Sequence, residues 1–216
     1  MGKKIVLIVL FILPLVVYMF FATGVNKFVN LPTLTKNIQE IPSWKSLNDE
    51  KVQLKEKITI LGFLGDDVLL EKGNLFNLKQ KIYNKNKEFK DFQIVMIAPA
   101  GTENDIKSII QQLGTISDLS GWHFVFSSHD SIASFHKQLK LQEKLNPSKG
   151  TPNVYIIDKD INLRGRKGED LKGEKEYKEG YNTISAADLH NNMSDDVKVI
   201  LAEYRLALKR NNKRKI

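Results

Sequence analysis

The hydrophobic pattern begins with one continuous apolar run near the N-terminus. Residues 5–22, IVLIVLFILPLVVYMFFA, form 18 uncharged positions directly after Lys3 and Lys4. A helix that crosses a hydrocarbon core of about 30 Å needs nearly this length, and the apolar region of a cleaved signal peptide is usually shorter. The run predicts one transmembrane helix, a signal-anchor kept in the mature protein. Removal as a signal peptide is the alternative.

The next part of the chain changes from an irregular pattern to a regular one. Residues 23–50 contain Pro32 and Pro42 without a clean period, which predicts a tether. From Ile58 onward, apolar strand patterns alternate with helical ones, and a last helix is expected from about Ser194. The predicted strands are ITILGFL (58–64), QIVMIAP (93–99), WHFVF (122–126), NVYIID (153–158) and INLRGR (161–166).

These elements follow the order βαβαβαββα. Strands that alternate with helices predict a largely parallel central sheet with helices on both faces. Lys159-Asp160 separates the last two strands and predicts a tight hairpin, which adds an antiparallel edge. The fold class expected is therefore α/β, with a mixed central sheet flanked by helices over residues 51–210.

One connection is long. Residues 165–192 join the last strand to the last helix and mix both charge signs with several glycines. Such a segment predicts a mobile, solvated loop. The alternative is a loop that binds a partner, with Tyr177 and Tyr181 as its contact residues.

Composition and charge narrow the function. The chain of 216 residues is 42% hydrophobic and 27% charged, as expected for a globular protein, and it has no cysteine. Disulfides, thiol nucleophiles and zinc-thiolate sites are therefore excluded. Of the net charge of +8, seven positive charges lie at the two ends, so the part between them carries only +1 and nucleic-acid binding is not expected. The seven are Lys3, Lys4, Lys209, Arg210, Lys213, Arg214 and Lys215.

The lysines also suggest a topology. Their slight bias predicts that residues 1–4 are cytoplasmic and that the body lies in a periplasmic or other extracytoplasmic space. Residues 211–216 form a basic tail, interpreted as a solubilising end; attraction to an anionic membrane face is the alternative.

The strand-turn-helix start and the late hairpin after a proline resemble the thioredoxin-like fold. Five segments resemble the SCO (SenC-type) family of membrane-anchored proteins, which assist copper delivery to cytochrome c oxidase. The resemblance covers roughly residues 50–210 and the anchor. The segments are ITILGFLG, FQIVMIAPAGTENDIKSIIQQLG, SGWHFVFSS, NVYIIDKDINLRGR and SDDVKVILAEYRLALKRN.

The copper site of that family does not carry over to this chain. The family places Cys-x-x-x-Cys in the turn after the first core strand and a histidine just before the late hairpin. Here the turn reads GDDVLL and the later segment reads KGTPN. Thr151-Pro152 resembles the cis-proline turn of thioredoxins, so a cis bond is expected there. The candidate vestigial-site positions are Gly65, Asp66, Asp67, Leu70, Gly150, Thr151 and Pro152.

Other chemistry has weaker support in the sequence. Asp66 and Asp67 are neighbours in an extended segment, so their side chains point to opposite faces, which favours a solvated turn or helix capping over an acid/base pair. No histidine or lysine is placed beside them by local spacing. His129 and His136 are seven residues apart and can share one face of a helix. The sequence places no third metal ligand beside them, which favours surface or half-buried histidines over a metal site. The four histidines are His123, His129, His136 and His190.

The resemblance and the missing thiols together imply a function. We expect a binding or assembly module related to respiratory oxidase biogenesis, without a cofactor of its own and with a protein partner in the extracytoplasmic space. The alternatives are an enzyme that uses the carboxylates of Asp66 and Asp67, and copper handling in which a partner supplies the sulfur ligands.

Overall fold

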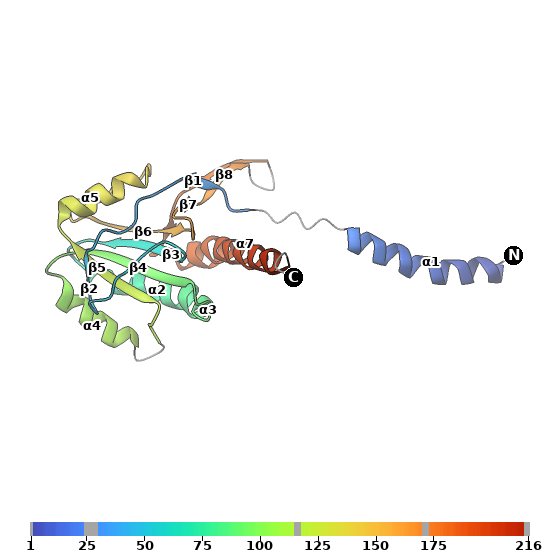
Figure 1. Cartoon of the computed structure of the whole chain (residues 1–216), viewed down its shortest axis with the longest axis horizontal. Helices are drawn as coiled ribbons and strands as arrows, with labels where there is room; N and C mark the ends of the chain where they lie inside the picture. The colour runs from blue at the N-terminus through green and yellow to red at the C-terminus, as the bar shows by residue number, and fades with distance from the viewer. Residues whose placement is uncertain (1, 24–29, 115–117, 170–172, 214–216) are drawn as a thin grey trace.

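The computed structural model describes residues 2–23, 30–114, 118–169 and 173–213 (Figure 1). The helices are α1 Gly2–Thr23, α2 Lys72–Leu78, η1 Lys79–Tyr83, α3 Asn84–Asn86, α4 Glu103–Gly114, α5 His129–Gln138, α6 Ala186–Asp188, η2 Leu189–Met193 and α7 Ser194–Lys213. The strands are β1 Thr33–Thr35, β2 Lys45–Ser46, β3 Ile58–Leu64, β4 Phe92–Pro99, β5 Trp122–Ser127, β6 Gly150–Ile157, β7 Leu163–Arg164, β8 Arg166–Glu169, β9 Lys175–Lys178 and β10 Tyr181–Asn182.

One mixed sheet forms the centre of the body. Its strand order is β1-β7-β6-β3-β4-β5-β2, and β10 also pairs with β6. Strands β3, β4 and β5 are parallel, whereas β6 runs antiparallel to β3 and forms a hairpin with β7. The expected order of core elements and the hairpin at Lys159-Asp160 are therefore confirmed.

The sheet is covered on both faces, which explains why β3 and β4 are buried along their whole length. Ile58 and Ile60 of β3 belong to the apolar cluster beneath α2, α4 and α7, while Leu61 and Phe63 belong to the cluster beneath α5. The two groups of helices lie on opposite sides of the sheet in Figure 1. Because its alternate residues pack against opposite faces of the sheet, β3 is apolar along most of its length, and this apolar run is the signal from which the strand was predicted.

The segment expected to be a tether is part of the body from residue 31 onward. Leu31, Ile38 and Ile41 are buried, and Trp44 packs edge-on against Phe135 with ring centroids 5.4 Å apart. Strand β1 pairs with β7 at one end of the sheet, and β2 pairs with β5 at the other. The spacing of these apolar residues fits an extended chain crossing the sheet face, so it follows neither a helical nor a strand period.

The connection over residues 165–192 is ordered, so the expectation of a mobile loop was wrong for the residues that the structure describes. It contains the β8–β9 hairpin, β10, α6 and η2. Arg166 donates to Asp196 at 2.7 Å and to Glu176 at 2.9 Å, and buried Tyr181 donates to Asp196 at 2.6 Å. These ion pairs and hydrogen bonds join residues that are 10 to 30 positions apart. They therefore leave no local sequence pattern from which the order of this segment could be predicted. Tyr177 is exposed, in contrast to Tyr181.

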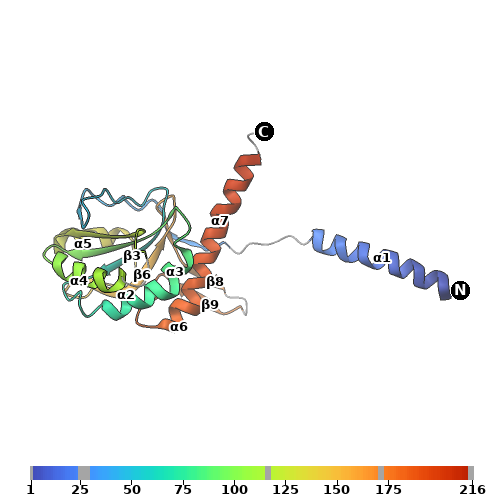
Figure 2. The same ribbon diagram turned by 90° about the horizontal axis from the view of Figure 1, so that it is seen from below.

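The first and the last segments that the structure describes, Gly2–Thr23 and Ser194–Lys213, are helical. Helix α1 spans the apolar run, and α7 begins at Ser194 as expected; its C-terminal part projects beyond the sheet in Figure 2. Among the described residues, no helix combines the length and hydropathy that a membrane span requires. The transmembrane anchor over residues 5–22 stays a prediction. Of the expected basic tail, residues 214–216 lie outside the described part of the chain.

Candidate functional site at the carboxyl edge of the sheet

The candidate site lies where the three parallel strands end and antiparallel β6 begins. We call this region, residues 65–71, 99–103, 127–131 and 148–152, the carboxyl edge. Gly65, with φ of 73°, follows β3, and Gly150 pairs with Leu64. A Cβ atom on Gly150 would lie 2.8 Å from the Leu64 carbonyl oxygen, and one on Gly65 would lie 3.0 Å from the Gly150 amide nitrogen. The two segments singled out by the sequence are therefore adjacent, and their backbones meet without side chains between them.

Asp66 forms an ion pair or hydrogen bond with His129. The His129 Nε2 atom lies 2.8 Å and 3.0 Å from the two Asp66 carboxylate oxygens, and both side chains are about half exposed. Ser128 positions His129 because its hydroxyl accepts from the Ser131 amide and caps the N-terminus of α5. Since an ionised carboxylate only accepts, Nε2 donates, and Nδ1 is the ring nitrogen that faces no carboxylate in this pair.

The rest of the turn exposes two leucines. The Leu70 amide donates to the Asp67 carbonyl at 3.0 Å and the Glu71 amide donates to the Val68 carbonyl at 3.1 Å, so the chain is already winding toward α2. Val68 is fully buried, whereas Leu69 is 55% exposed and Leu70 is 80% exposed. Directly after the two aspartates, Val68 therefore packs in the core, whereas Leu69 and Leu70 present their apolar side chains to the solvent.

Pro152 follows a trans peptide bond, so the expected cis bond was wrong. The β3–β6 ladder is irregular here: Gly62 pairs with Val154 and Phe63 pairs with Thr151, which leaves two residues of β6 between these pairs. A bulge accommodates a proline because proline has no N–H to donate to the ladder. The Pro152 carbonyl accepts from the Thr183 amide at 2.9 Å, which fixes the β10 region beside the site.

Thr151 faces an internal network and not the Asp66 carboxylate. The Glu143 carboxylate accepts three hydrogen bonds, from the Thr151 hydroxyl at 2.6 Å, the Asn153 amide group at 2.7 Å and the Tyr155 hydroxyl at 2.7 Å. Burial and the Glu143 carboxylate both raise the pKa of Tyr155. We call this cluster the Glu143 hub. The hub holds β6 to the segment after α5. Thr151, one of the vestigial-site positions, has its hydroxyl engaged in this hub.

The histidines separate into unrelated places. His129 lies at the carboxyl edge, whereas His136 is 8% exposed and packs edge-on against Phe63, with ring centroids 5.1 Å apart. The His136 Nε2 atom has no hydrogen-bond partner among the described residues. His123 lies near Glu50, at 3.7 Å. Within the described part of the chain, no three His, Asp or Glu side chains are grouped so that they could hold a metal ion.

Comparisons with known proteins bear on the fold. No protein-family model and no curated protein matches the chain. Among solved structures, a putative protein disulfide isomerase from Bacteroides thetaiotaomicron has a TM-score of 0.52 at 11% identity and covers 81% of this chain and 95% of its own. The thioredoxin domain of a Bacteroides vulgatus thiol-disulfide oxidoreductase has a TM-score of 0.46 at 19% identity, covering 77% of this chain and 98% of its own. The Sco1 soluble domain from Bacillus subtilis has a TM-score of 0.46 at 13% identity, covering 81% and 99%.

The fold is thioredoxin-like. At such low identity the likeness shows the fold alone, and the two structures with TM-scores below 0.5 add no argument about activity. The expected fold is confirmed in this respect.

The site also shows what the sequence did not provide. No local signal joins Asp66 to His129, because 63 residues separate them. The topology supplies the join, since both residues directly follow parallel strands that end at one edge. Applying that rule to the predicted thioredoxin-like strands would have placed the segment after WHFVF beside the segment after ITILGFL.

Buried His136 predicts a pH dependence of stability in the thioredoxin-like domain. Burial lowers the pKa of His136, although Glu143 and Glu179 oppose the shift. As the pH falls below about 6.5, the unfolded chain therefore takes up a proton before the folded chain does. The free energy of unfolding should fall over this window and level off below the folded pKa.

Urea denaturation at pH 7.5 and pH 5.5 checks this expectation. His136→Leu, which keeps an apolar side chain in the core, should show a smaller loss between the two pH values than the wild-type chain. The control is His190→Gln, at an exposed position, which should keep the wild-type loss. An unchanged loss in His136→Leu would assign the pH dependence to other groups.

Proposed function

We propose that this chain is a binding or assembly module of SCO type, anchored in a membrane with its thioredoxin-like domain in an extracytoplasmic space, and related to respiratory oxidase biogenesis. The observation that carries the proposal is the exposure of Leu69 and Leu70 on the turn after β3. Exposed large apolar side chains at a rigid edge favour contact with a partner protein. The SCO type, the location and the oxidase rest on the sequence resemblance.

The chemistry of the turn supports binding over catalysis by thiols. The chain has no cysteine, so this turn carries out no thiol-disulfide exchange. Its side chains instead offer carboxylates and leucines. Gly65 and Gly150 hold the turn against β6, which gives the leucines a fixed backbone to project from.

The charge of the carboxyl edge indicates the kind of partner. Asp66 and Asp67 precede the leucines, and the first turns of α4 and α5 add Glu103 and Asp130, against one lysine within the edge, Lys149. These acids complement the helix dipoles and also make the edge acidic on a chain whose net charge is +8. The partner that fits is a protein segment with an apolar side chain between basic residues.

Replacing both leucines should remove the partner without unfolding the chain. In Leu69→Ser/Leu70→Ser, recovery of an oxidase subunit or assembly factor cross-linked in native membranes should fall about tenfold, since two exposed anchors at an interface are worth over 1 kcal/mol. The free energy of unfolding should change by less than about 0.5 kcal/mol because the positions are exposed.

The matched control is Tyr177→Ser, an exposed aromatic residue in the β8–β9 hairpin, which should keep full recovery. The same set of cross-linked proteins in all three chains would contradict the proposal. Loss of recovery only in Tyr177→Ser would move the partner surface from the carboxyl edge to the hairpin.

A second candidate function has one specific observation in its favour. The Asp66–His129 pair is the carboxylate-imidazole arrangement of a general base, with Nδ1 as the atom that would take a proton. His129→Gln separates the two functions, because it removes the base and keeps the acidic side chains of the edge. An acid/base enzyme loses its cellular phenotype in this variant while partner recovery persists, whereas a binding module keeps both.

Copper provides a further test of the proposal. The module is proposed to bind no copper of its own, because the turn lacks sulfur and the segment at Gly150 lacks histidine. Stoichiometric, tight binding of Cu(I) or Cu(II) by the purified chain would contradict this. Copper binding that appears only after a thiol-bearing partner is added would instead support shared ligands.

A further inference from the structure

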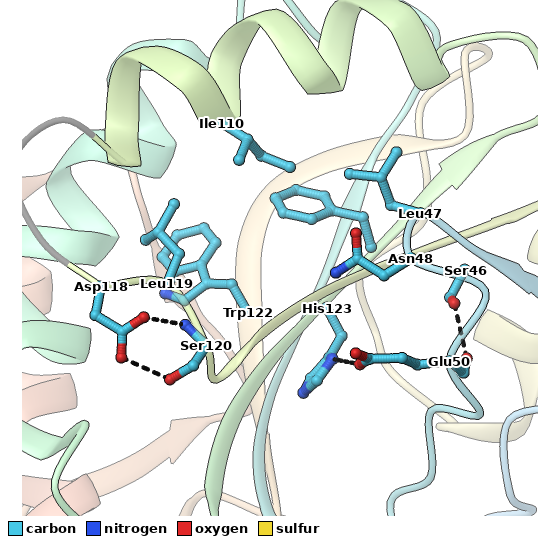
Figure 3. Close-up of a pocket in the computed structure, with 11 residues that line it drawn as sticks. Ser46, Leu47, Asn48, Glu50, Ile110, Asp118, Leu119, Ser120, Trp122 and His123 are labelled. Carbon is cyan, nitrogen blue, oxygen red and sulfur yellow. Dashed lines mark hydrogen bonds and ion pairs between the residues drawn. The ribbon is translucent and has the colours of Figure 1, made fainter.

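The edge of the sheet opposite the carboxyl edge differs in charge from one side to the other. We call it the amino edge, because the parallel strands β3, β4 and β5 begin there. Where β5 begins, the edge is acidic: Asp118 and Glu50 border a pocket whose described lining holds no lysine or arginine (Figure 3). Where β3 and β4 begin, α7 packs beside them and basic side chains are in excess. Only the part beside α7 therefore suits an anionic partner.

A cleft of about 220 Å³ lies between α7 and the starts of β3 and β4. Its lining includes the buried side chains of Ile58 and Leu201 and the half-buried rings of Phe89 and Tyr204. Basic side chains complete the lining. Partly exposed rings beside basic side chains are typical of the boundary between a membrane and water, where the rings lie at the level of the lipid headgroups.

Three cations border the cleft, against one carboxylate. The cations are Lys90, Lys159 and Arg205, and the carboxylate is that of Asp91, which forms an ion pair with Lys159. Lys90 and Arg205 are exposed, and within the described part of the chain neither is paired with a carboxylate. The Arg205 guanidinium lies 5.8 Å from the centroid of the Phe89 ring, which holds it beside the cleft. Two cations are therefore available to an anion.

Helix α7 extends this positive charge beyond the sheet, past which its C-terminal part projects in Figure 2. The Glu203 carboxylate is occupied, because it accepts from Arg164 and from the Leu31 amide. After it, residues 204–216 contain six basic residues and no acidic one. A helix dipole favours basic residues only in the last turn, which does not account for Arg205, eight residues before the end of α7. We call the cleft and residues 204–213 the basic surface.

The covalent chain keeps the basic surface close to the predicted anchor. Leu31 joins the N-terminal segment to the body, and its amide donates at 2.8 Å to Glu203, beside the cleft. Seven peptide units connect Thr23 to Asn30, and they span at most about 25 Å. The carboxyl edge lies at the other end of β3, which has seven residues and is therefore about 20 Å long. The basic surface is thus at the end of the body where the anchor joins.

Given the membrane anchor of the proposed function, on which this inference rests, we propose that the basic surface binds the anionic phospholipid headgroups of the same membrane. Lipid phosphates pair with Lys90, Arg205 and the basic end of α7, and the half-buried rings of the cleft contact the headgroup region. Docking in this way turns Leu69 and Leu70 away from the bilayer. A partner protein then reaches them from the aqueous side.

Two labelled forms of the full chain, reconstituted in vesicles, test the docking. The chain has no cysteine, so one fluorophore can be attached through Ala202→Cys on α7 or through Gly73→Cys near the carboxyl edge. Position 202 is partly exposed, and a side chain at position 73 meets no other atom within 4 Å. A nitroxide carried on lipid headgroups quenches a fluorophore only at close range, so it reports which end of the body lies on the bilayer.

Quenching at position 202 should be about threefold stronger in vesicles with 30% phosphatidylglycerol than in vesicles of phosphatidylcholine alone. Sodium chloride at 0.5 M should remove this difference, because it shortens the Debye length to about 4 Å. Quenching at position 73 should be weak in both kinds of vesicle. Equal quenching at position 202 in both, or stronger quenching at position 73 than at position 202, would overturn the proposal.

Lys90→Gln together with Arg205→Gln should lower the ratio of docked to undocked chain about tenfold, because each basic residue near an anionic surface adds several-fold to binding. The matched control is Lys167→Gln with Lys175→Gln, which removes the same charge from exposed positions of the β8–β9 hairpin. It should change the ratio less than twofold. An unchanged ratio in the first pair would overturn the role of the cleft. Equal losses in both pairs would overturn a specific surface and assign the attraction to net charge.

Flotation of the unlabelled chain with vesicles separates this proposal from the proposed anchor. A chain that floats with phosphatidylcholine vesicles in 0.5 M sodium chloride is held by the anchor, and a lack of docking would then overturn the basic surface alone. A chain that floats only with phosphatidylglycerol vesicles at low salt would contradict the anchor and support the basic surface. Neither outcome depends on the partner proposed for Leu69 and Leu70, because the cleft and the carboxyl edge share no residues.

Discussion

Replacing Arg164 by alanine is expected to lower the free energy of unfolding by about 3 to 5 kcal/mol. The Arg164 guanidinium, 8% exposed, donates to Asp158 at 3.0 Å and to Glu203 at 2.8 Å. Its Nε also donates to the Leu31 carbonyl at 2.8 Å. Removing the guanidinium leaves Asp158 buried without its cation, and the cost of that unpaired charge dominates the expected loss.

The same change should loosen both ends of the folded body. Leu31 is where the N-terminal segment joins the sheet, and its amide donates to Glu203 of α7 at 2.8 Å. Arg164 therefore connects the entering chain, the β6–β7 hairpin and α7. Amide hydrogen exchange in residues 30–38 and in α7 should rise in Arg164→Ala more than in β3 and β4.

Urea denaturation checks the size of this effect. Lys167→Ala is the matched control, because it removes an exposed cation three residues away and should cost less than about 0.5 kcal/mol. A loss below 1 kcal/mol in Arg164→Ala would mean that water reaches Asp158 and Glu203 and that the ion pairs contribute little.

The parts of the fold that the sequence predicted are those with a dense local signal. Strands β3 and β4 are buried along all of their seven and eight residues and are apolar except for Thr59 and Gln93, because both faces of the sheet are covered. The β6–β7 hairpin is marked by Lys159-Asp160, and Asp158 supports it by accepting from the Asp160 and Asn162 amides, each at 2.9 Å. The residues that specify each of these elements lie within a few positions of one another along the chain, so the local sequence pattern is enough to predict the element.

The parts that the sequence missed depend on distant partners. Arg166 orders the 165–192 connection through Asp196, and Leu31 is held through Arg164 and Glu203. Neither relation has a period along the chain. Asp66 and His129 are the same case at the candidate site, where the segments that follow β3 and β5 meet only because parallel strands share an edge. The argument from Asp66 and Asp67 alone favoured a solvated turn or helix capping, because the partner of Asp66, His129, lies 63 residues away.

The Glu143 hub makes the second large prediction. Glu143→Ala should lower the free energy of unfolding by about 3 kcal/mol, because three donors lose one acceptor group and each unsatisfied buried donor costs about 1 kcal/mol or more. The donors are Thr151, Asn153 and Tyr155, all on β6. The estimate uses the lower end of that range because Glu143 is half-buried and water can replace part of it.

Glu143→Gln separates the loss of charge from the loss of the acceptor. A glutamine can place its carbonyl oxygen where it accepts from Asn153 and Tyr155, and its NH₂ group can then donate to the Thr151 hydroxyl. That hydroxyl already accepts from the Asn153 backbone amide at 3.1 Å, so it can serve as an acceptor. We therefore expect a cost of about 1 kcal/mol for the glutamine variant, near the net value of one hydrogen bond.

Urea denaturation of the two variants decides between two roles of the hub. If Glu143 acts as a hydrogen-bond acceptor, the alanine variant loses about three times as much stability as the glutamine variant. Equal losses would mean that the negative charge itself matters, for example through His136, whose pKa Glu143 raises against the effect of burial.

If Glu143 acts as a hydrogen-bond acceptor, the hub keeps the Thr151 side chain turned away from Asp66. The start of β6 then gives the carboxyl edge a fixed backbone and no side chain for chemistry, which is what a binding surface at Leu69 and Leu70 requires.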